Sequence, residues 1–453
     1  MNKVTHFFTW LKDRHVHVIY SLGLLAIPFL SGAQEREISL KEAVSFALKN
    51  SHTLTKDKIQ KLKSENQLQE AKNLQLPIAT LGLGFSHMQV PGNEIMLGNH
   101  YLVLGKHGEA YNGSINISKD IYNNISHYKR KNYELLVKLA DLDFEKNKDE
   151  IILNIVEQYM ELYKIVMQFQ VIAQNIKDVD RLIDQSEQFY KHGVVTKNDV
   201  LRFKLQKSDI LIQQNELVTA KEIINYNLLI LLGLHEDVEL VPKVEDTPEA
   251  QHLEELDNYR EFALLERAEV RRNEVYTEIN NTYLKQVKGN LYPKLSVDLG
   301  SSYSHLGSAF LPERGNYIGQ FAAGLSLKWN MDGLWLNKTK VNDAKIKQNE
   351  NRAVINETKD LIKREVNNSF MQYQKSLHNI EILKASIDHA EENNRIIETQ
   401  YENHIATVID RIDANTQLFA ALNKIEIAKT NAIITWYRFL KHTGKISNLF
   451  KEI

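Results

Sequence analysis

The chain has no cysteine among its 453 residues. This absence excludes disulfide frameworks, thiol catalysis, cysteine metal sites and lipid attachment to an N-terminal cysteine. An excess of one charge is also lacking, because 56 Lys and Arg nearly balance 58 Asp and Glu. The balance argues against a nucleic-acid binder of the basic-patch type. The hydrophobic share of 43% argues against a disordered chain.

Long apolar runs are scarce. The stretch Val18–Leu30 is continuously apolar and uncharged, but its 13 residues are fewer than the roughly 20 that a spanning helix needs. Basic residues precede it and Ser-Gly-Ala follows it, an order that predicts a secretory signal peptide over 1–33, cleaved before Gln34. An uncleaved membrane anchor is the alternative. The mean hydropathy of −0.38 excludes a bundle of transmembrane helices, but not a barrel of alternating strands.

Proline and glycine are few and unevenly placed. Of the 19 glycines, seven lie in 77–113 and seven in 289–333. Residues 114–192 and 334–443 contain neither glycine nor proline. Glycine and proline are the two strongest helix breakers. The chain is therefore predicted to contain a helix, then a window rich in these breakers, then a very long helical block, and to repeat this order once.

Apolar residues in the long blocks follow a helical period. Steps of three and four residues, typical of a coiled-coil seam, separate the members of two sets: Ile152, Ile155, Tyr159, Leu162, Val166 and Phe169, and Phe370, Tyr373, Leu377 and Ile380. Helices of about 60 residues would be about 90 Å long. Such lengths indicate a rod or a tube rather than a globular domain.

An internal duplication is visible by subtraction. An offset of 211 residues relates four pairs of identical residues, namely Tyr190 and Tyr401, Thr196 and Thr407, Asp199 and Asp410, and Gly233 and Gly444. The repeat predicts a first structural unit over 34–233, a connector over 234–262 and a second unit over 263–453.

The breaker-rich windows alternate apolar and polar residues with a period of two. This pattern predicts strands near 79–90, 110–119, 294–304 and 320–330. A soluble, half-buried sheet is one interpretation. A membrane barrel with a polar lumen is the other, and export and aromatic residues at strand ends favour it. Four strands are too few for a conducting barrel, so several chains would contribute, and three copies would give twelve strands without exposed edges.

With these features in place, the mature chain resembles the TolC family of outer-membrane channels. The resemblance rests on four segments: Ile38–Val44 resembles the opening helix, Pro77 and Pro293 stand at helix-to-strand junctions, Tyr190–Leu201 resembles a hairpin tip, and Leu231–Gly233 resembles the end of a return helix. Each motif is weak alone, and their order and duplication carry the match.

The resemblance implies a mainly α fold with a β-barrel part. Duplicated long-helix hairpins would form a periplasmic α-barrel, and four strands per chain would contribute to a trimeric twelve-stranded barrel in the outer membrane of a Gram-negative bacterium. It also implies a homotrimer in outer-membrane lipid that works with a periplasmic adaptor protein and an inner-membrane pump of the RND or ABC type. The function expected is a passive, gated exit duct for efflux or type I secretion. The cargo cannot be read from the chain.

Two aspartates match acidic residues that line the periplasmic constriction in TolC-like channels. Asp410 and Asp413 are three residues apart, so both project from one face of a helix. Three chains would present two acidic rings, which favour cations. The alternative for Asp410, and for Asp199 in the first repeat, is a helix-capping box begun by the preceding threonine.

Tyr401 and Asp199 match a pair that, in the family, holds the closed gate by a hydrogen bond between hairpins. Simple packing of Tyr401 between helices is the alternative. The family often has a basic residue at the position of Ala406, so the resemblance implies a gate with one restraint fewer.

The hairpin tips are the implied adaptor-docking sites, with Gly193 and Val194 in the first repeat and His404 and Ile405 in the second. Histidine stands at 404 where the family usually has glycine. Because histidine tolerates a left-handed backbone less well, we expect the second tip to differ in shape.

The sequence contains no motif that indicates an enzyme. The 16 histidines are scattered, and neither a metal site nor a phosphate-binding loop nor a nucleophile motif stands out. No cofactor is expected. An exported coiled-coil structural or adaptor protein without a pore is the alternative function, and it leaves the two alternating windows without a role.

Overall fold

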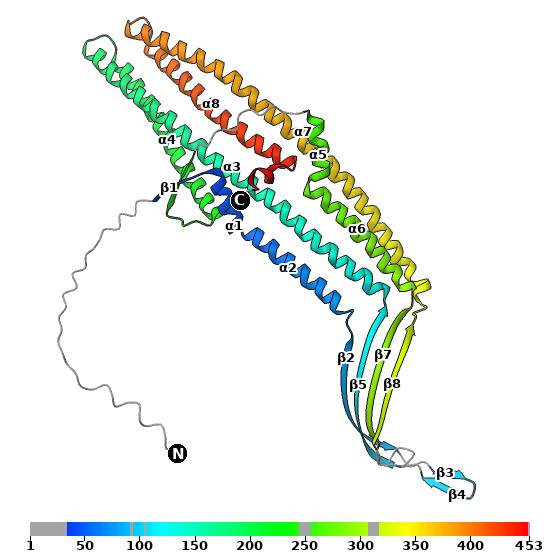
Figure 1. The fold of residues 1–453 in the computed structure, drawn as a ribbon. Coiled ribbons are helices and arrows are strands. Elements are labelled where there is room, and N and C mark those ends of the chain that lie inside the picture. Colours follow the sequence, from blue (N-terminus) through cyan, green and yellow to red (C-terminus); the bar gives the residue numbers. More distant parts are fainter. Residues whose placement is uncertain (1–33, 91–93, 104–105, 244–254, 307–316, 452–453) are drawn as a thin grey trace, which may run out of the picture.

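The computed structural model describes residues 34–90, 94–103, 106–243, 255–306 and 317–451. The predicted signal peptide lies outside the described residues, and so does part of the predicted connector. The described chain is mostly helical and elongated, with a sheet at one end and helical hairpins at the other (Figure 1).

Four long strands form one antiparallel sheet. They are β2 (Ile78–Val90), β5 (Lys106–Tyr122), β7 (Lys294–Leu306) and β8 (Tyr317–Lys328), in the order β2-β5-β7-β8. The contact between β5 and β7 joins the two breaker-rich windows. A further hairpin of β3 (Glu94–Leu97) and β4 (His100–Val103) extends beyond the sheet (Figure 1).

The two faces of this sheet differ in polarity. Directly paired residues share a face, and one register row contains Phe85, Tyr111, His305 and Tyr317. The same face carries Leu83, Phe321 and Leu325, exposed by 82%, 76% and 71%. The opposite face carries mainly serine, asparagine and glycine, as in the row Gly82, Ser114, Ser302 and Gln320. One chain therefore leaves a large apolar surface uncovered.

Four helices meet the sheet. α2 (His52–Asn73) leads into β2 and α6 (Ala268–Lys288) leads, through the short turn η1 (Gly289–Leu291), into β7. α3 (Asn124–Lys191) follows β5 and α7 (Gly333–Glu402) follows β8. The last two have 68 and 70 residues, so each is about 100 Å long. α6 packs between α3 and α7, and α2 packs on α3.

The return helices are shorter. α4 (Lys197–Leu232) packs along α3, and α8 (Val408–His442) packs along α7 and also contacts α3. Gly233 ends α4 in a left-handed conformation with φ of 67°, a backbone geometry that glycine adopts without a Cβ penalty.

A mixed group of short elements, called the belt here, packs against the middle of the long helices. β1 (Gln34–Ile38) pairs in parallel with β6 (Val238–Pro242), and α1 (Leu40–Asn50), α5 (Leu256–Glu266) and η2 (Ile446–Phe450) pack nearby.

The main core lies inside the belt, and the predicted seam of α3 contributes to it. Ile152, Ile155 and Leu162 are at most 1% exposed. Val166 and Phe169 are only half-buried, and Ile165 takes the buried position. The shift is expected, because a straight helix of 3.6 residues per turn drifts away from a 3.5-residue repeat.

The elbow between α5 and α6 holds a buried cation. Arg267 is 4% exposed, and its guanidinium nitrogens lie 2.6 Å from oxygens of Glu269 and of Glu365. The Nδ1 atom of His442 lies 3.2 Å from the same Glu365 oxygen. Burial alone would raise the pKa of Glu365, but the hydrogen bonds from His442 and Arg267 lower it to about 2. This cluster fixes the belt to α7 and to the end of α8.

Acid should therefore weaken the belt. Because the pKa of Glu365 is about 2 in the folded chain against 4.5 ordinarily, the unfolded state binds more protons between these values. The contribution of Glu365 to the free energy of unfolding is fully present above about pH 4.5. It is lost as the pH drops toward 2 and amounts to about 2–3 kcal/mol. Glu365→Gln should reduce the difference between urea unfolding free energies measured at pH 6 and pH 3.

Glu392→Gln is the matched control. Glu392 pairs with Arg395 on one exposed helix face, where solvent screens the interaction, so the pH dependence should stay close to that of the unchanged protein. An unaltered pH dependence in Glu365→Gln would contradict the assignment.

Candidate functional site

Both helical hairpins end at the pole opposite the sheet. The turn between α3 and α4 and the turn between α7 and α8 lie side by side there (Figure 1). Every site residue that the sequence singled out lies in these two turns or in the adjoining helix ends.

The two turns share a left-handed residue and one backbone hydrogen bond. In the first, the amide of Val194 donates to the carbonyl of Phe189 over 2.9 Å, and Gly193 has φ of 73°. In the second, the amide of Ile405 donates to the carbonyl of Gln400 over 2.8 Å, and His404 has φ of 60°. The second turn adds a bond from the amide of Ala406 to the same carbonyl over 3.2 Å, so the two tips are similar without being identical.

The side chain of His404 explains part of this outcome. Its ring lies edge-on to the ring of Phe189 in the first hairpin, with centroids 4.8 Å apart. This contact joins the two tips, and it offsets part of the cost of a left-handed histidine, about 1–2 kcal/mol. Val194 and Ile405 project from the tips, 46% and 74% exposed.

Capping boxes begin both return helices. Thr196 accepts from the backbone amide of Asp199 and Thr407 from that of Asp410, and each aspartate accepts in return through its Oδ2 atom. Hydrogen bonds from the hydroxyl and amide of Thr407 lower the pKa of Asp410. The capping alternative is thus present at both positions.

Asp413 lies one turn further along α8. Its side chain is exposed, as is that of Asp410, and its Oδ2 atom accepts a hydrogen bond from Gln417 over 2.7 Å. The two carboxylates share one exposed side of α8, while Val408, Arg411 and Ala414 on the other side are buried.

Tyr401 is buried between the hairpins. It is 3% exposed and lies against the rings of Phe189 and Phe203. Burial raises the pKa of its phenol, the Ser186 hydroxyl lowers it, and the charge of Asp199 raises it again. Tyr401 and Asp199 are thus neighbours, although within the described chain Asp199 takes its hydrogen bonds from Thr196.

Arg411 is the residue that the sequence analysis missed. It is 1% exposed, its Nη1 atom donates to Asn394 over 2.7 Å, and its Nη2 atom lies 3.5 Å from Glu398. Burial lowers the pKa of its guanidinium. Glu398 also lies 3.3 Å from Arg181 on α3, so the charges connect the two hairpins. The available signal was a charge at a core-facing position, three residues after Val408.

Among the described residues, His, Asp and Glu side chains are nowhere gathered in a group of three or more that could hold a metal ion. In the same part of the chain, no helix combines the length and the apolarity needed to cross a membrane.

Comparisons with known proteins agree with this arrangement. The family described as outer membrane efflux protein matches residues 260–445. No curated protein matches the chain. The structure is similar to that of the outer-membrane channel OprN, with 15% identity over 90% of each chain and a TM-score of 0.75.

Two further channels show the same likeness. CusC is 14% identical, with 89% of this chain and 91% of that chain covered and a TM-score of 0.74. The Campylobacter jejuni CmeC outer membrane channel is 16% identical, with 91% and 88% covered and a TM-score of 0.73. The fold is therefore that of outer-membrane efflux channels, and the resemblance to the TolC family is confirmed.

The left-handed turns allow a direct test. Gly193→Ala should lower the free energy of unfolding by about 1 kcal/mol, because a Cβ there meets open space but strains the backbone. His404→Gly is the matched reverse change. It should raise the free energy of unfolding by less than about 1 kcal/mol, because the contact with Phe189 is lost. Urea unfolding followed by circular dichroism measures both. An equal stability for Gly193→Ala would mean that the first turn relaxes.

Proposed function

Taking the likeness to outer-membrane efflux channels as the premise, we propose that this chain forms a passive, gated exit duct in an outer membrane. Three copies would assemble into a twelve-stranded barrel continuous with a tunnel of helices. A periplasmic adaptor would dock on the hairpin tips, and an inner-membrane pump of the RND or ABC type would supply the energy. The cargo would be selected by that pump.

The sheet carries this proposal. Among the strands that the structure describes, the edge strands β2 and β8 pair only with β5 and β7, and unpaired edges are a liability that closed barrels remove. β8 is exposed along all of its residues. Pairing β8 of one copy with β2 of the next closes the sheet, and twelve strands leave a lumen that four cannot.

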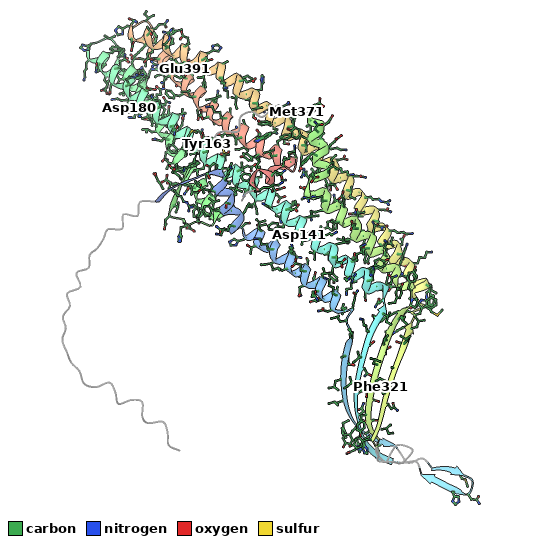
Figure 2. The ribbon with its side chains drawn as sticks, in the orientation of Figure 1. Asp141, Tyr163, Asp180, Phe321, Met371 and Glu391 are labelled. Carbon is green, nitrogen blue, oxygen red and sulfur yellow. The ribbon has the colours of Figure 1, made fainter. Side chains whose placement is uncertain are left out.

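Polarity decides which face would meet lipid. The row of Phe85, Tyr111, His305 and Tyr317, with Leu83, Phe321 and Leu325 on the same face, would form the apolar band and an aromatic girdle at its outer end. The serine- and asparagine-rich face would line water. Figure 2 labels Phe321 on this sheet, far from the hairpin tips.

The gate would lie at the tips. In a trimer Asp410 and Asp413 would form two acidic rings, which hold cations in a narrow passage. Capping does not remove Asp410 from this role, because both of its bonds to Thr407 use Oδ2. The buried Tyr401, its neighbour Asp199 and the linked tips at His404 would hold the hairpins in the resting arrangement.

The first experiment measures mass and conductance on one detergent-purified sample. A trimer with small, cation-selective conductance in a planar bilayer is expected. Phe321→Arg should reduce membrane insertion strongly, since arginine facing lipid costs about 2–4 kcal/mol. Gln320→Arg, the neighbouring change on the opposite face, should insert normally.

A protein that stays soluble without detergent and conducts nothing would overturn this proposal. It would favour an exported coiled-coil structural or adaptor protein. Equal insertion of the two arginine variants would reject the assignment of faces alone.

The acidic rings predict a second result. Asp413→Asn should weaken block of the conductance by trivalent cations by about tenfold, because one of the two proposed rings loses its three carboxylates. Asp257→Asn removes an exposed aspartate of α5 in the belt and should leave the block unchanged. Unaltered block in Asp413→Asn would place Asp413 outside the constriction.

A further inference from the structure

The four helices that meet the sheet share one pattern at that end. At each junction an exposed apolar or aromatic residue lies next to the sheet, and an exposed lysine lies four residues away on the helix side. The pairs are Leu76 with Lys72 (the turn after α2 and the end of α2), Ile125 with Lys129 (α3), Tyr292 with Lys288 (the residue after η1 and the end of α6) and Leu334 with Lys338 (α7). The pattern occurs whether the helix begins or ends at the sheet, so helix polarity does not explain it.

The spacing matches the depth of a lipid headgroup layer. Four residues of helix advance about 6 Å. A headgroup layer is about 5–7 Å thick on each side of the hydrocarbon core. With the apolar residue at the edge of the hydrocarbon, the ammonium group one turn away stands at the level of the phosphates, and the flexible lysine stem adjusts the fit.

Two tryptophans lie in the same layer. Trp329 follows the last residue of β8, is 45% exposed and donates from its indole nitrogen to the carbonyl of Leu291 over 3.3 Å. Trp335 in the first turn of α7 is 65% exposed. Exposed indole rings of this kind are enriched where a protein crosses the boundary between hydrocarbon and water.

Positive charge is concentrated at this junction. Residues 285–294 contain three lysines and no acidic residue, residues 119–131 contain four basic residues and one aspartate, and residues 328–340 contain three lysines and one aspartate. The chain as a whole has a net charge of −2. Lys72, Lys129, Lys288 and Lys338 form no salt bridge with any residue that the structure describes.

The junction is also hollowed. A cavity of about 590 Å³ lies where β5 meets α3, with Lys119, Tyr122 and Arg130 in its lining. Another of about 420 Å³ lies where β7 and β8 meet the helices, with Tyr292 and Lys340 in its lining. Each lining also contains one aspartate, Asp120 in the first cavity and Asp332 in the second, beside the cationic and aromatic side chains.

We infer that this junction is a binding surface for anionic phospholipids, with the four lysines at the level of the headgroup phosphates. The inference rests on the proposed membrane barrel, and it adds the lipid class that the protein selects. A phosphatidylglycerol-type headgroup keeps a net negative charge, whereas phosphatidylcholine carries its own cation, so the uncompensated lysines favour the former.

The test compares retained lipid. Protein is purified in dodecyl maltoside micelles that contain equal amounts of phosphatidylglycerol and phosphatidylcholine, and the lipid bound to the trimer is measured by mass spectrometry. Retention should favour phosphatidylglycerol by about three- to fivefold. The quadruple change K72Q, K129Q, K288Q and K338Q should bring the ratio close to that of the micelle.

Two matched variants complete the design. K177Q, K191Q, K375Q and K384Q together remove the same charge from exposed helix positions away from the junction and should leave the preference unchanged. Arginine at the four junction positions keeps the charge and should keep the preference. Each sample is also measured in sodium phosphate and in sodium chloride at equal ionic strength.

The outcomes separate the inference from the proposed function. A trimer that inserts and conducts but retains both lipids equally overturns the lipid site alone. The lipid site is also overturned if the control variant loses the preference for phosphatidylglycerol as fully as the junction variant does. It is overturned as well if only inorganic phosphate abolishes the preference, because the lysines would then bind a free anion. A protein that retains no lipid and needs no detergent overturns the barrel and the lipid site together.

Discussion

Uninterrupted backbone hydrogen bonding in α3 and α7 is the constraint on which the rest of the structure depends. With 68 and 70 residues and no internal glycine or proline, each helix carries the chain about 100 Å from the sheet to the tips. Most of the stability of helices in proteins comes from packing of an apolar face, so these helices need partners along their sides. The partners are α2, α4, α6 and α8, each of which packs on α3, on α7 or on both. The belt packs against the middle of the two long helices.

The buried charges lie where separate helices meet. Arg267 connects the α5–α6 elbow to Glu365 on α7, and Arg411 shares Glu398 with Arg181 near the tips. Taking such charges out of water is costly, and only good partners repay the cost. The belt cluster is well paired, whereas the Nε atom of Arg411 has no hydrogen-bond partner among the described residues and its ion pair with Glu398 is longer, at 3.5 Å. The tips are therefore held less firmly than the belt, which suits a region proposed to move.

The two ends of the molecule differ in how their backbone groups and apolar surfaces are satisfied. At the tips, two similar turns and two capping boxes close the hairpins with local hydrogen bonds. At the sheet, the outer edges of β2 and β8 are unpaired among the described strands, and the apolar face is exposed in the described chain. In the proposed assembly, further copies would pair along the strand edges, and lipid would cover the apolar face and the lysine-bearing junction.

The sequence by itself determined the features that depend on near neighbours. Helix length followed from the absence of breakers, strand faces from period-two alternation, and the capping boxes at Thr196 and Thr407 from a three-residue spacing. Tertiary structure decided what depends on distant segments. The parallel pairing of β1 with β6, some 200 residues apart, has no local signal, and neither has the contact of His404 with Phe189 that supports a left-handed histidine. Arg411 could be read only as a surface charge, because the carboxylate and amide that make its burial tolerable come from α7 across the hairpin.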